Sequence, residues 1–311
     1  MAEKLSTRAG YGKALVELAE QYDFYVLDAD LAEATKTIDF AKKYPSRFFD
    51  MGIAEGDMVG TAAGLAACGA TVIASTFAVF AAGRAYEQVR NAVCYNNLNV
   101  KIAGTHGGIL IGEDGGSHQA IEDVSLMRTI PNMKVIVPSD AVEARYAVEA
   151  AIKEPGPVYL RFGRYDVPIF NTNDDYSFTF GKANVLKTGT DVTVIAMGDM
   201  VYETLVASEE LAKDGISVGV VNMHTIKPID KEAIKNAIDT SKYVITAEDH
   251  NVYGGLYSAV AEVAAEFGGK ISDKIAVEDR FGQSGNRSDL QKEYGLTAEN
   301  IIAKIRNLMK S

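Results

Sequence analysis

Residues 100–119 read VKIAGTHGGILIGEDGGSHQ, a short β-branched run followed by a loop rich in glycine. Five of the residues from 105 to 119 are glycine, and each glycine inside a helix or strand costs about 0.5–1 kcal/mol. The loop also holds two of the four histidines of the chain, His106 and His118, with Glu113 and Asp114 between them. Imidazoles and carboxylates on a glycine-rich loop are typical of a site for a small polar ligand. A surface turn that binds nothing is the alternative.

The segments around this loop alternate between two patterns. From residue 24 to residue 162, short β-rich runs are followed by stretches whose apolar residues recur at helical spacing. This alternation predicts a mostly parallel sheet covered by helices, and ligands of such sheets lie at the carboxyl ends of the strands, where the loop follows Val100–Ala103. The predicted strands are Phe24–Leu27, Thr71–Ala74, Val100–Ala103, Lys134–Val137 and Val158–Arg161, and the predicted helices are Ala54–Ala67, Arg84–Tyr95, Ile121–Arg128 and Val142–Lys153.

A second series of the same kind follows a break rich in Gly, Asn, Asp and Pro. We therefore predict an α/β protein with two domains, residues 1–168 and 189–311, joined by a linker at 169–188 with room for one edge hairpin, each domain being a mostly parallel sheet covered by helices. Asp230 is expected to cap a helix. Predicted strands of the second series are Val192–Met197, Val218–Val221 and Tyr243–Ala247, and its predicted helices are Thr204–Lys213, Lys231–Ile238, Gly255–Phe267 and Ala298–Met309.

Composition narrows the class of protein. The chain has 311 residues, of which 47% are hydrophobic and 23% charged, as in a globular protein. Its net charge of −11 argues against a nucleic-acid groove or an anionic membrane surface as partner. Cys68 and Cys94 lie in apolar helical patterns, as core residues of a reducing compartment do. With no apolar leader and no run long enough to span a bilayer, the expected location is cytoplasmic.

Three further features could carry chemistry. Glu55 begins a predicted helix, where the helix dipole alone would favour a carboxylate; a carboxylate facing a heterocycle could instead shift its protonation. Phe77 and Phe80 follow a predicted strand and could stack on a flat ring, although core packing is the simpler reading. Arg8 and Arg164 lie near element ends, and arginine makes bidentate contacts to phosphate.

These pieces, in this order, resemble the C-terminal half of transketolase, which comprises the pyrimidine-binding and C-terminal domains. The resemblance covers nearly the whole chain, and the Gly-Glu-Asp-Gly loop with its two histidines is its most specific part. The Gly-Asp-Gly and Asn signature that holds magnesium and diphosphate in thiamine enzymes is absent and belongs to the other half of such enzymes. The chain thus looks like the C-terminal subunit of a split transketolase. Matching segments are residues 51–58, MGIAEGDM; 75–80, STFAVF; 105–119; 135–140, VIVPSD; and 162–168, FGRYDVP.

The resemblance implies roles toward thiamine diphosphate. Glu55 would hydrogen-bond the pyrimidine ring and favour its imino tautomer, and it would be catalytic together with His118. Phe77 and Phe80 would form the aromatic wall of the pyrimidine pocket. Asp30 would lie near the cofactor at the subunit interface, and His118 would lie beside the cofactor amino group and the substrate oxygens.

The resemblance also implies substrate contacts. Arg8, His106 and Arg164 would bind the distal phosphate of the sugar, and Asp114 would read the hydroxyl next to the carbonyl.

The sequence departs from the family pattern at two places. Ala34 stands where the family usually has a serine near the phosphate. Thr35 or Lys36 would take over the role of that serine, and Thr35 is the expected substrate ligand. The aromatic run is followed by Ala-Ala-Gly where many transketolases carry a further aromatic residue.

Cofactor and partners follow from the same resemblance. The expected cofactors are thiamine diphosphate and a divalent cation, Mg or Ca, held mainly by an N-terminal partner subunit, with no metal ligands in this chain. The expected assembly is an α2β2 heterotetramer acting on sugar phosphates in carbohydrate metabolism, as in the pentose phosphate pathway. Three alternatives remain: a deoxyxylulose-phosphate-synthase-like enzyme, the beta subunit of a 2-oxoacid dehydrogenase, and a non-catalytic module of the same fold.

Overall fold

Seven strands form the larger sheet, in the order β12-β6-β7-β5-β4-β2-β3. The computed structural model describes residues 3–171 and 176–310. All neighbours in this sheet are parallel except β12, which is antiparallel to β6. The central strands β4 and β5 are buried along their whole length, as expected for a parallel sheet covered on both faces. The strands are β2 (Tyr25–Asp28), β3 (Phe48–Asp50), β4 (Val72–Phe77), β5 (Val100–Thr105), β6 (Lys134–Ile136), β7 (Val158–Arg161) and β12 (Thr225–Lys227).

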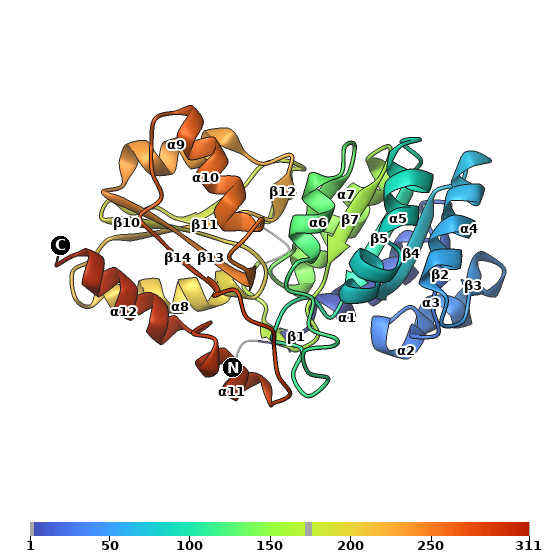
Figure 1. The fold of residues 1–311 in the computed structure, drawn as a ribbon, viewed down its shortest axis with the longest axis horizontal. Coiled ribbons are helices and arrows are strands. Elements are labelled where there is room, and N and C mark those ends of the chain that lie inside the picture. Colours follow the sequence, from blue (N-terminus) through green and yellow to red (C-terminus); the bar gives the residue numbers. More distant parts are fainter. Residues whose placement is uncertain (1–2, 172–175, 311) are drawn as a thin grey trace.

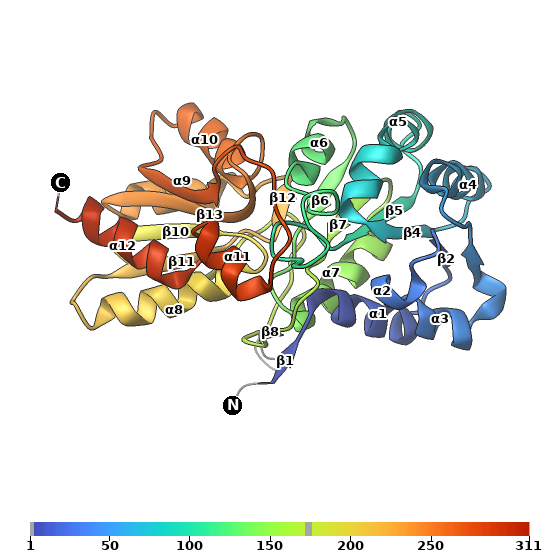
Figure 2. The same cartoon turned by 60° about the horizontal axis from the view of Figure 1, so that its bottom comes forward.

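Helices cover both faces of this sheet because side chains alternate along each strand. Val26 packs into one core with α1 (Thr7–Leu18), α3 (Ile38–Lys43) and α7 (Ala141–Lys153). Leu27, its neighbour, packs into another core with α4 (Glu55–Ala67) and α6 (Asp123–Thr129). Figure 2 shows these two groups of helices on opposite sides of the sheet. The shorter helical segments are α2 (Ala32–Thr35), η1 (Pro45–Arg47) and α5 (Tyr86–Gln88), which lies between the π-helical turns η2 (Phe80–Arg84) and η3 (Val89–Cys94).

The second sheet has five strands in the order β14-β13-β10-β11-β9, parallel except for the edge strand β9. In Figure 1, α9 and α10 lie on one face of it, and α8 and α12 lie on the other. A two-stranded ribbon joins β1 (Lys4–Leu5) to β8 (Val167–Pro168). The remaining bounds are β9 (Asn184–Lys187), β10 (Val192–Ala196), β11 (Val218–Asn222), β13 (Tyr243–Asn251), β14 (Asp273–Val277), α8 (Met200–Ala212), α9 (Lys231–Thr240), α10 (Leu256–Glu266), α11 (Arg287–Glu293) and α12 (Ala298–Leu308).

The predicted fold class is confirmed: two mostly parallel sheets are covered by helices. Several elements differ from the sequence prediction. Helix α1 was not predicted, and the predicted helix Arg84–Tyr95 is α5 flanked by two π-helical turns. Strand β9 lies inside the predicted linker 169–188 and pairs with β11, so this segment is partly sheet; residues 172–175 of the linker lie outside the described residues.

The strand β12 joins the two halves of the chain. It belongs by sequence to the second half, yet it completes the larger sheet by pairing with β6, as Figure 1 shows between the two units. Asp230 caps α9 as predicted, accepting the Ala233 N–H at 3.2 Å. The domain limits 1–168 and 189–311 therefore stay a prediction, because the larger sheet contains strands from both predicted domains. No helix in the described residues is long and apolar enough to cross a membrane.

Candidate active site

Three neighbouring strands bring predicted site residues to one edge of the larger sheet. Strands β2, β4 and β5 are parallel, so their carboxyl ends meet at that edge. Phe77 ends β4 and pairs in register with Thr105, the residue before His106. Asp30 follows β2, is exposed, and donates its backbone N–H to the carboxylate of Asp50 at 3.1 Å. The expected cofactor neighbour thus lies at the same edge.

Four rings form a compact group there. The ring of Phe77 stacks on His106 with centroids 3.9 Å apart and lies 5.8 Å from the nearly parallel ring of Phe80. His118 approaches Phe80 edge-on at 5.4 Å, and its Nδ1 is 2.9 Å from the hydroxyl of Ser117. The structure therefore brings together both loop histidines and both phenylalanines.

Glu55 is the carboxylate of this region. It is the first residue of α4 and its side chain is only 4% exposed. The guanidinium of Arg84 donates to its Oε1 at 3.1 Å and also covers the ring of Phe80 at 4.0 Å. Arg84 was not among the predicted site residues. The only sequence feature that could have indicated Arg84 is that a positively charged residue directly follows the apolar run 77–83.

A second group of side chains meets His106 at its Nε2 atom. Arg8 lies 3.4 Å from its Nε2 and donates to the backbone oxygens of Arg164 and Ala34 at 3.0 and 2.8 Å. Burial and the neighbouring guanidiniums of Arg8 and Arg164 lower the pKa of His106 to about 3. The imidazole is therefore neutral at physiological pH, and the positive charge of this group comes from the arginines.

Asp114 is paired with Arg164 in this chain. Arg164 donates to Oδ2 of Asp114 at 3.1 Å and to the backbone oxygen of Ile111 at 2.6 Å. Glu113, on the same loop, accepts the hydroxyl of Tyr165 at 2.9 Å. Arg8, His106, Arg164 and Asp114, all predicted as substrate ligands, thus form one connected group.

Thr35 does not join this group through its side chain. Thr35 is fully buried, and its hydroxyl donates to the carboxylate of Asp28 at 2.7 Å, so this hydroxyl is hydrogen-bonded inside the protein. The choice of Thr35 as a substrate ligand therefore stays a prediction, and it would require the hydroxyl to leave Asp28. The charge of Lys36 contributes to the lowered pKa of His106.

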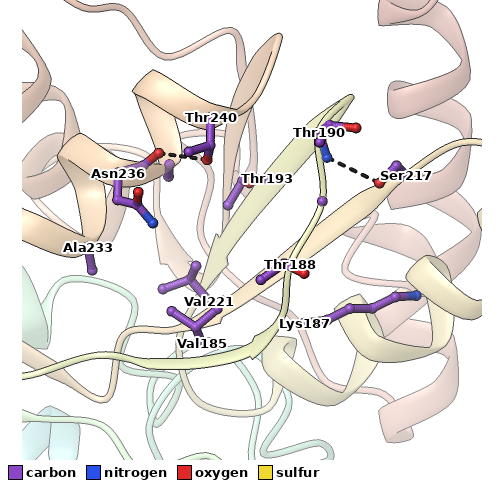
Figure 3. A pocket seen from close by; sticks show the side chains of 12 residues that line it. Val185, Lys187, Thr188, Thr190, Thr193, Ser217, Val221, Ala233, Asn236 and Thr240 are labelled. Atoms are coloured by element: carbon purple, nitrogen blue, oxygen red, sulfur yellow. Dashed lines mark hydrogen bonds between the residues drawn. The ribbon is translucent and has the colours of Figure 1, made fainter.

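The second half of the chain contains a separate pocket, shown in Figure 3, with a volume of about 250 Å³. It lies between α9 and the strands at the β9 edge of the smaller sheet, and none of the predicted site residues lines it. Its walls are hydroxyl, amide and aliphatic groups, among them Thr190, Thr193 and Asn236. Within residues 3–171 and 176–310, no three His, Cys, Asp or Glu side chains are grouped so that they could hold a metal ion.

Comparison with known families divides the chain into two matched regions. Residues 3–169 match the family model of the transketolase pyrimidine binding domain, and residues 181–301 match that of the transketolase C-terminal domain.

Individual relatives match along almost their whole length. A chain of Methanocaldococcus jannaschii described as a transketolase C-terminal section is 48% identical over 97% of this chain and 96% of its own. A 6-deoxy-6-sulfo-D-fructose transketolase subunit of Clostridium sp. is 43% identical over 95% of this chain and 92% of its own. A solved structure described as a split gene transketolase, inactive beta4 tetramer, superposes with a TM-score of 0.89 at 48% identity, covering 98% of both chains.

Proposed function

The chain is a member of the transketolase family, and on that premise we propose that it is the C-terminal subunit of a thiamine-diphosphate-dependent transketolase. Together with an N-terminal subunit, it would transfer a two-carbon ketol unit between ketose and aldose phosphates. The observation that carries this proposal is the arrangement at the edge of the larger sheet. There the buried carboxylate of Glu55, two phenylalanine rings and two imidazoles lie next to a cluster of basic side chains.

The residues present fit the pyrimidine end of the cofactor. A flat heterocycle needs aromatic or apolar faces and one polar group at a ring nitrogen, and Phe77, Phe80 and Glu55 provide both kinds of contact. When bound, thiamine diphosphate supplies an electron sink for breaking the carbon–carbon bond of the ketose. We assign the diphosphate and its Mg or Ca ion to the N-terminal subunit, with two copies of each chain in the active assembly.

Each proposed cofactor-binding residue of this chain then has one role. Glu55 holds a proton at the pyrimidine ring from inside the first turn of α4, and Phe77 with Phe80 orients that ring. His118, edge-on to Phe80, hydrogen-bonds substrate oxygens and moves a proton there. Asp30 supports the cofactor at the interface with the partner subunit.

The basic group holds the far end of the sugar. Arg8 and Arg164 supply charge to the phosphate, because the lowered pKa of His106 leaves its imidazole neutral and able only to hydrogen-bond. Lys36 adds a further cation from the turn after α2. Asp114 reads the sugar hydroxyl next to the carbonyl, exchanging part of its contact with Arg164 for that hydroxyl.

The test is reconstitution. This chain, its N-terminal partner, thiamine diphosphate and Mg should be mixed, and ketol transfer from a ketose phosphate to an aldose phosphate followed by product formation. Turnover is expected from the mixture and from neither chain alone, with a mass that corresponds to two copies of each.

The same assay separates the alternatives. Pyruvate in place of the ketose tests a deoxyxylulose-phosphate-synthase-like reaction and decarboxylation of a 2-oxoacid. Product from pyruvate but none from ketose phosphates would refute the transketolase proposal, and an assembled complex that binds cofactor but acts on neither donor would favour a non-catalytic module.

A further inference from the structure

We propose that the C-terminal domain positions the sugar-binding loop 105–119, chiefly through Asp249, which makes Asp249 a positioning residue for the substrate. The functional part of this inference rests on the proposed function. Asp249 lies on β13, within the smaller sheet, and is only 5% exposed. Its Oδ1 accepts the backbone N–H of Ile109 at 2.9 Å, and its Oδ2 accepts that of Leu110 at 3.1 Å.

The backbone of the loop fits closely against this carboxylate. Gly108 has φ +87°, and a Cβ atom added to it would lie 2.0 Å from Oδ2 of Asp249. Only glycine allows both the backbone angle and this approach. The position of the loop relative to the smaller sheet is therefore set by a contact that tolerates no side chain.

The segment before α11 holds the same loop at two further points. The hydroxyl of Ser284 donates to the backbone oxygen of Glu113 at 2.6 Å. The amide of Gln119 donates to the backbone oxygen of Gln283 at 3.0 Å. Figure 1 shows this red segment running beside the green loop between the two halves of the molecule.

The held residues connect directly to the predicted sugar ligands. Ile111, next to the residues that Asp249 binds, offers its backbone oxygen to Arg164 at 2.6 Å, and Arg164 pairs with Asp114. Further along, the backbone N–H of His118 donates to the oxygen of Gly115 at 3.0 Å. Displacing residues 109–111 would therefore move Arg164, the proposed phosphate ligand, and Asp114, the proposed ligand of the sugar hydroxyl. It would also move the start of the turn that carries His118.

The electrostatic surroundings make this contact dependent on ionisation. Burial raises the pKa of Asp249 to about 6, against the guanidinium of Arg161 and the two loop N–H groups, which lower it. Asp199, which pairs with Arg287, also raises it. The ionised carboxylate accepts both N–H groups more strongly than the neutral acid.

The neighbouring residue offers a matched control. Glu248 is also a buried carboxylate on β13, and it accepts two backbone N–H groups, those of Leu256 at 2.7 Å and Tyr257 at 2.8 Å. Because successive side chains of a strand point to opposite faces, Glu248 caps α10 inside its own domain and not the loop. Glu248→Gln should therefore perturb the domain without loosening the loop.

The first measurement is hydrogen exchange on the full chain at pH 7. Asp249→Asn should speed exchange at the amides of residues 109 and 110 by about 10–100-fold, while Glu248→Gln leaves these amides unchanged. Unchanged exchange in a folded Asp249→Asn chain, or equal loosening by Glu248→Gln, would overturn the positioning role. This readout needs no turnover, so it stands apart from the proposed function.

The second measurement uses the complex with the partner subunit. Asp249→Asn should raise KM for a ketose phosphate about tenfold and KM for hydroxypyruvate much less, since only the former reaches Arg164. Equal increases for both donors would overturn the link to sugar binding. If Asp249→Asn does not fold, Ser284→Ala, at an exposed position, should give smaller changes in the same directions. No change in either measurement would then refute the proposal.

Discussion

Arg84 donates to Oε1 of Glu55, the carboxylate that we propose for the cofactor ring. The ion pair joins a buried carboxylate to a guanidinium that is 55% exposed, and such pairs are worth about 0.2–1 kcal/mol after solvent screening. Arg84→Ala should therefore tighten binding of thiamine diphosphate to the assembled complex by about 1.5–5-fold, measured by titration calorimetry. Arg84→Lys keeps the charge and should lie close to wild type. Weaker binding by Arg84→Ala would show that the guanidinium supports the cofactor instead.

Glu55→Gln removes the carboxylate and keeps the shape of the side chain. The variant should assemble with its partner and lose activity by about 10²–10⁴-fold in kcat at saturating cofactor, since a group that holds the transferred proton is lost. Steady-state rates together with the mass of the complex provide the check. A rate near that of wild type would reduce Glu55 to a carboxylate that stabilises the start of α4.

The sequence allowed most of this cluster to be predicted, because its members lie in short segments with recognisable order. Glu55, Phe77, Phe80, His106 and His118 come from three such segments. Arg84 could not be placed in this way, because its contact with Glu55 depends on the π-helical turn η2, and no local pattern announces such a turn. The contacts of Asp249 could not be predicted, because they join residues about 140 positions apart in the sequence. The hydrogen bond from Thr35 to Asp28 is formed only when the fold buries both residues.

At the scale of elements, the turn after β7 and the glycine-rich loop carry the residues that we propose for phosphate binding. Arg164→Ala should raise KM for phosphorylated donors about 10–100-fold and leave hydroxypyruvate much less affected, because a charge-assisted phosphate contact contributes about 1.5–3 kcal/mol. Steady-state kinetics with both donors is the measurement. Asp114→Ala is the companion variant, and it should impair discrimination at the sugar hydroxyl while phosphate dependence persists. Equal damage to both donors by Arg164→Ala would assign Arg164 to loop structure.

Elements with a strong period could be predicted, and elements set by distant partners could not. The buried central strands of both sheets follow from their apolar runs. Helix α1 buries an apolar stripe at Tyr11, Ala14, Leu15 and Leu18, a spacing typical of a helix. Its Gly10 and Gly12, which look like helix breakers, allow close contact with Ala141 and Lys36. Strand β12 has only three residues and pairs with β6, about 90 residues earlier, so no local pattern predicts it.

At the scale of the whole molecule, ionisation inside the smaller sheet couples to stability. Burial raises the pKa of Glu248 from 4.5 to about 8, despite the two α10 N–H groups that lower it. Between these values the native chain binds a proton that the unfolded chain releases, so stability falls as pH rises. Relative to Glu248→Gln, wild type should lose up to about 1.4 kcal/mol of unfolding free energy per pH unit. Urea unfolding of both chains from pH 5 to pH 8 gives this difference, in which other groups cancel; a constant or rising difference would contradict the shift.

The pairing of β12, from the second half of the chain, with β6, from the first half, has a consequence for protein synthesis. The chain leaves the ribosome from its N-terminus, and β12 follows β6 by about 90 residues. At about 5–20 residues per second, β6 waits roughly 5–20 s for its outer neighbour. During that interval the sheet presents an open edge, which is a template for pairing with other chains. The nascent protein is therefore most exposed to aggregation between the synthesis of β6 and that of β12, after strands β2, β4 and β5 of the candidate site are already complete.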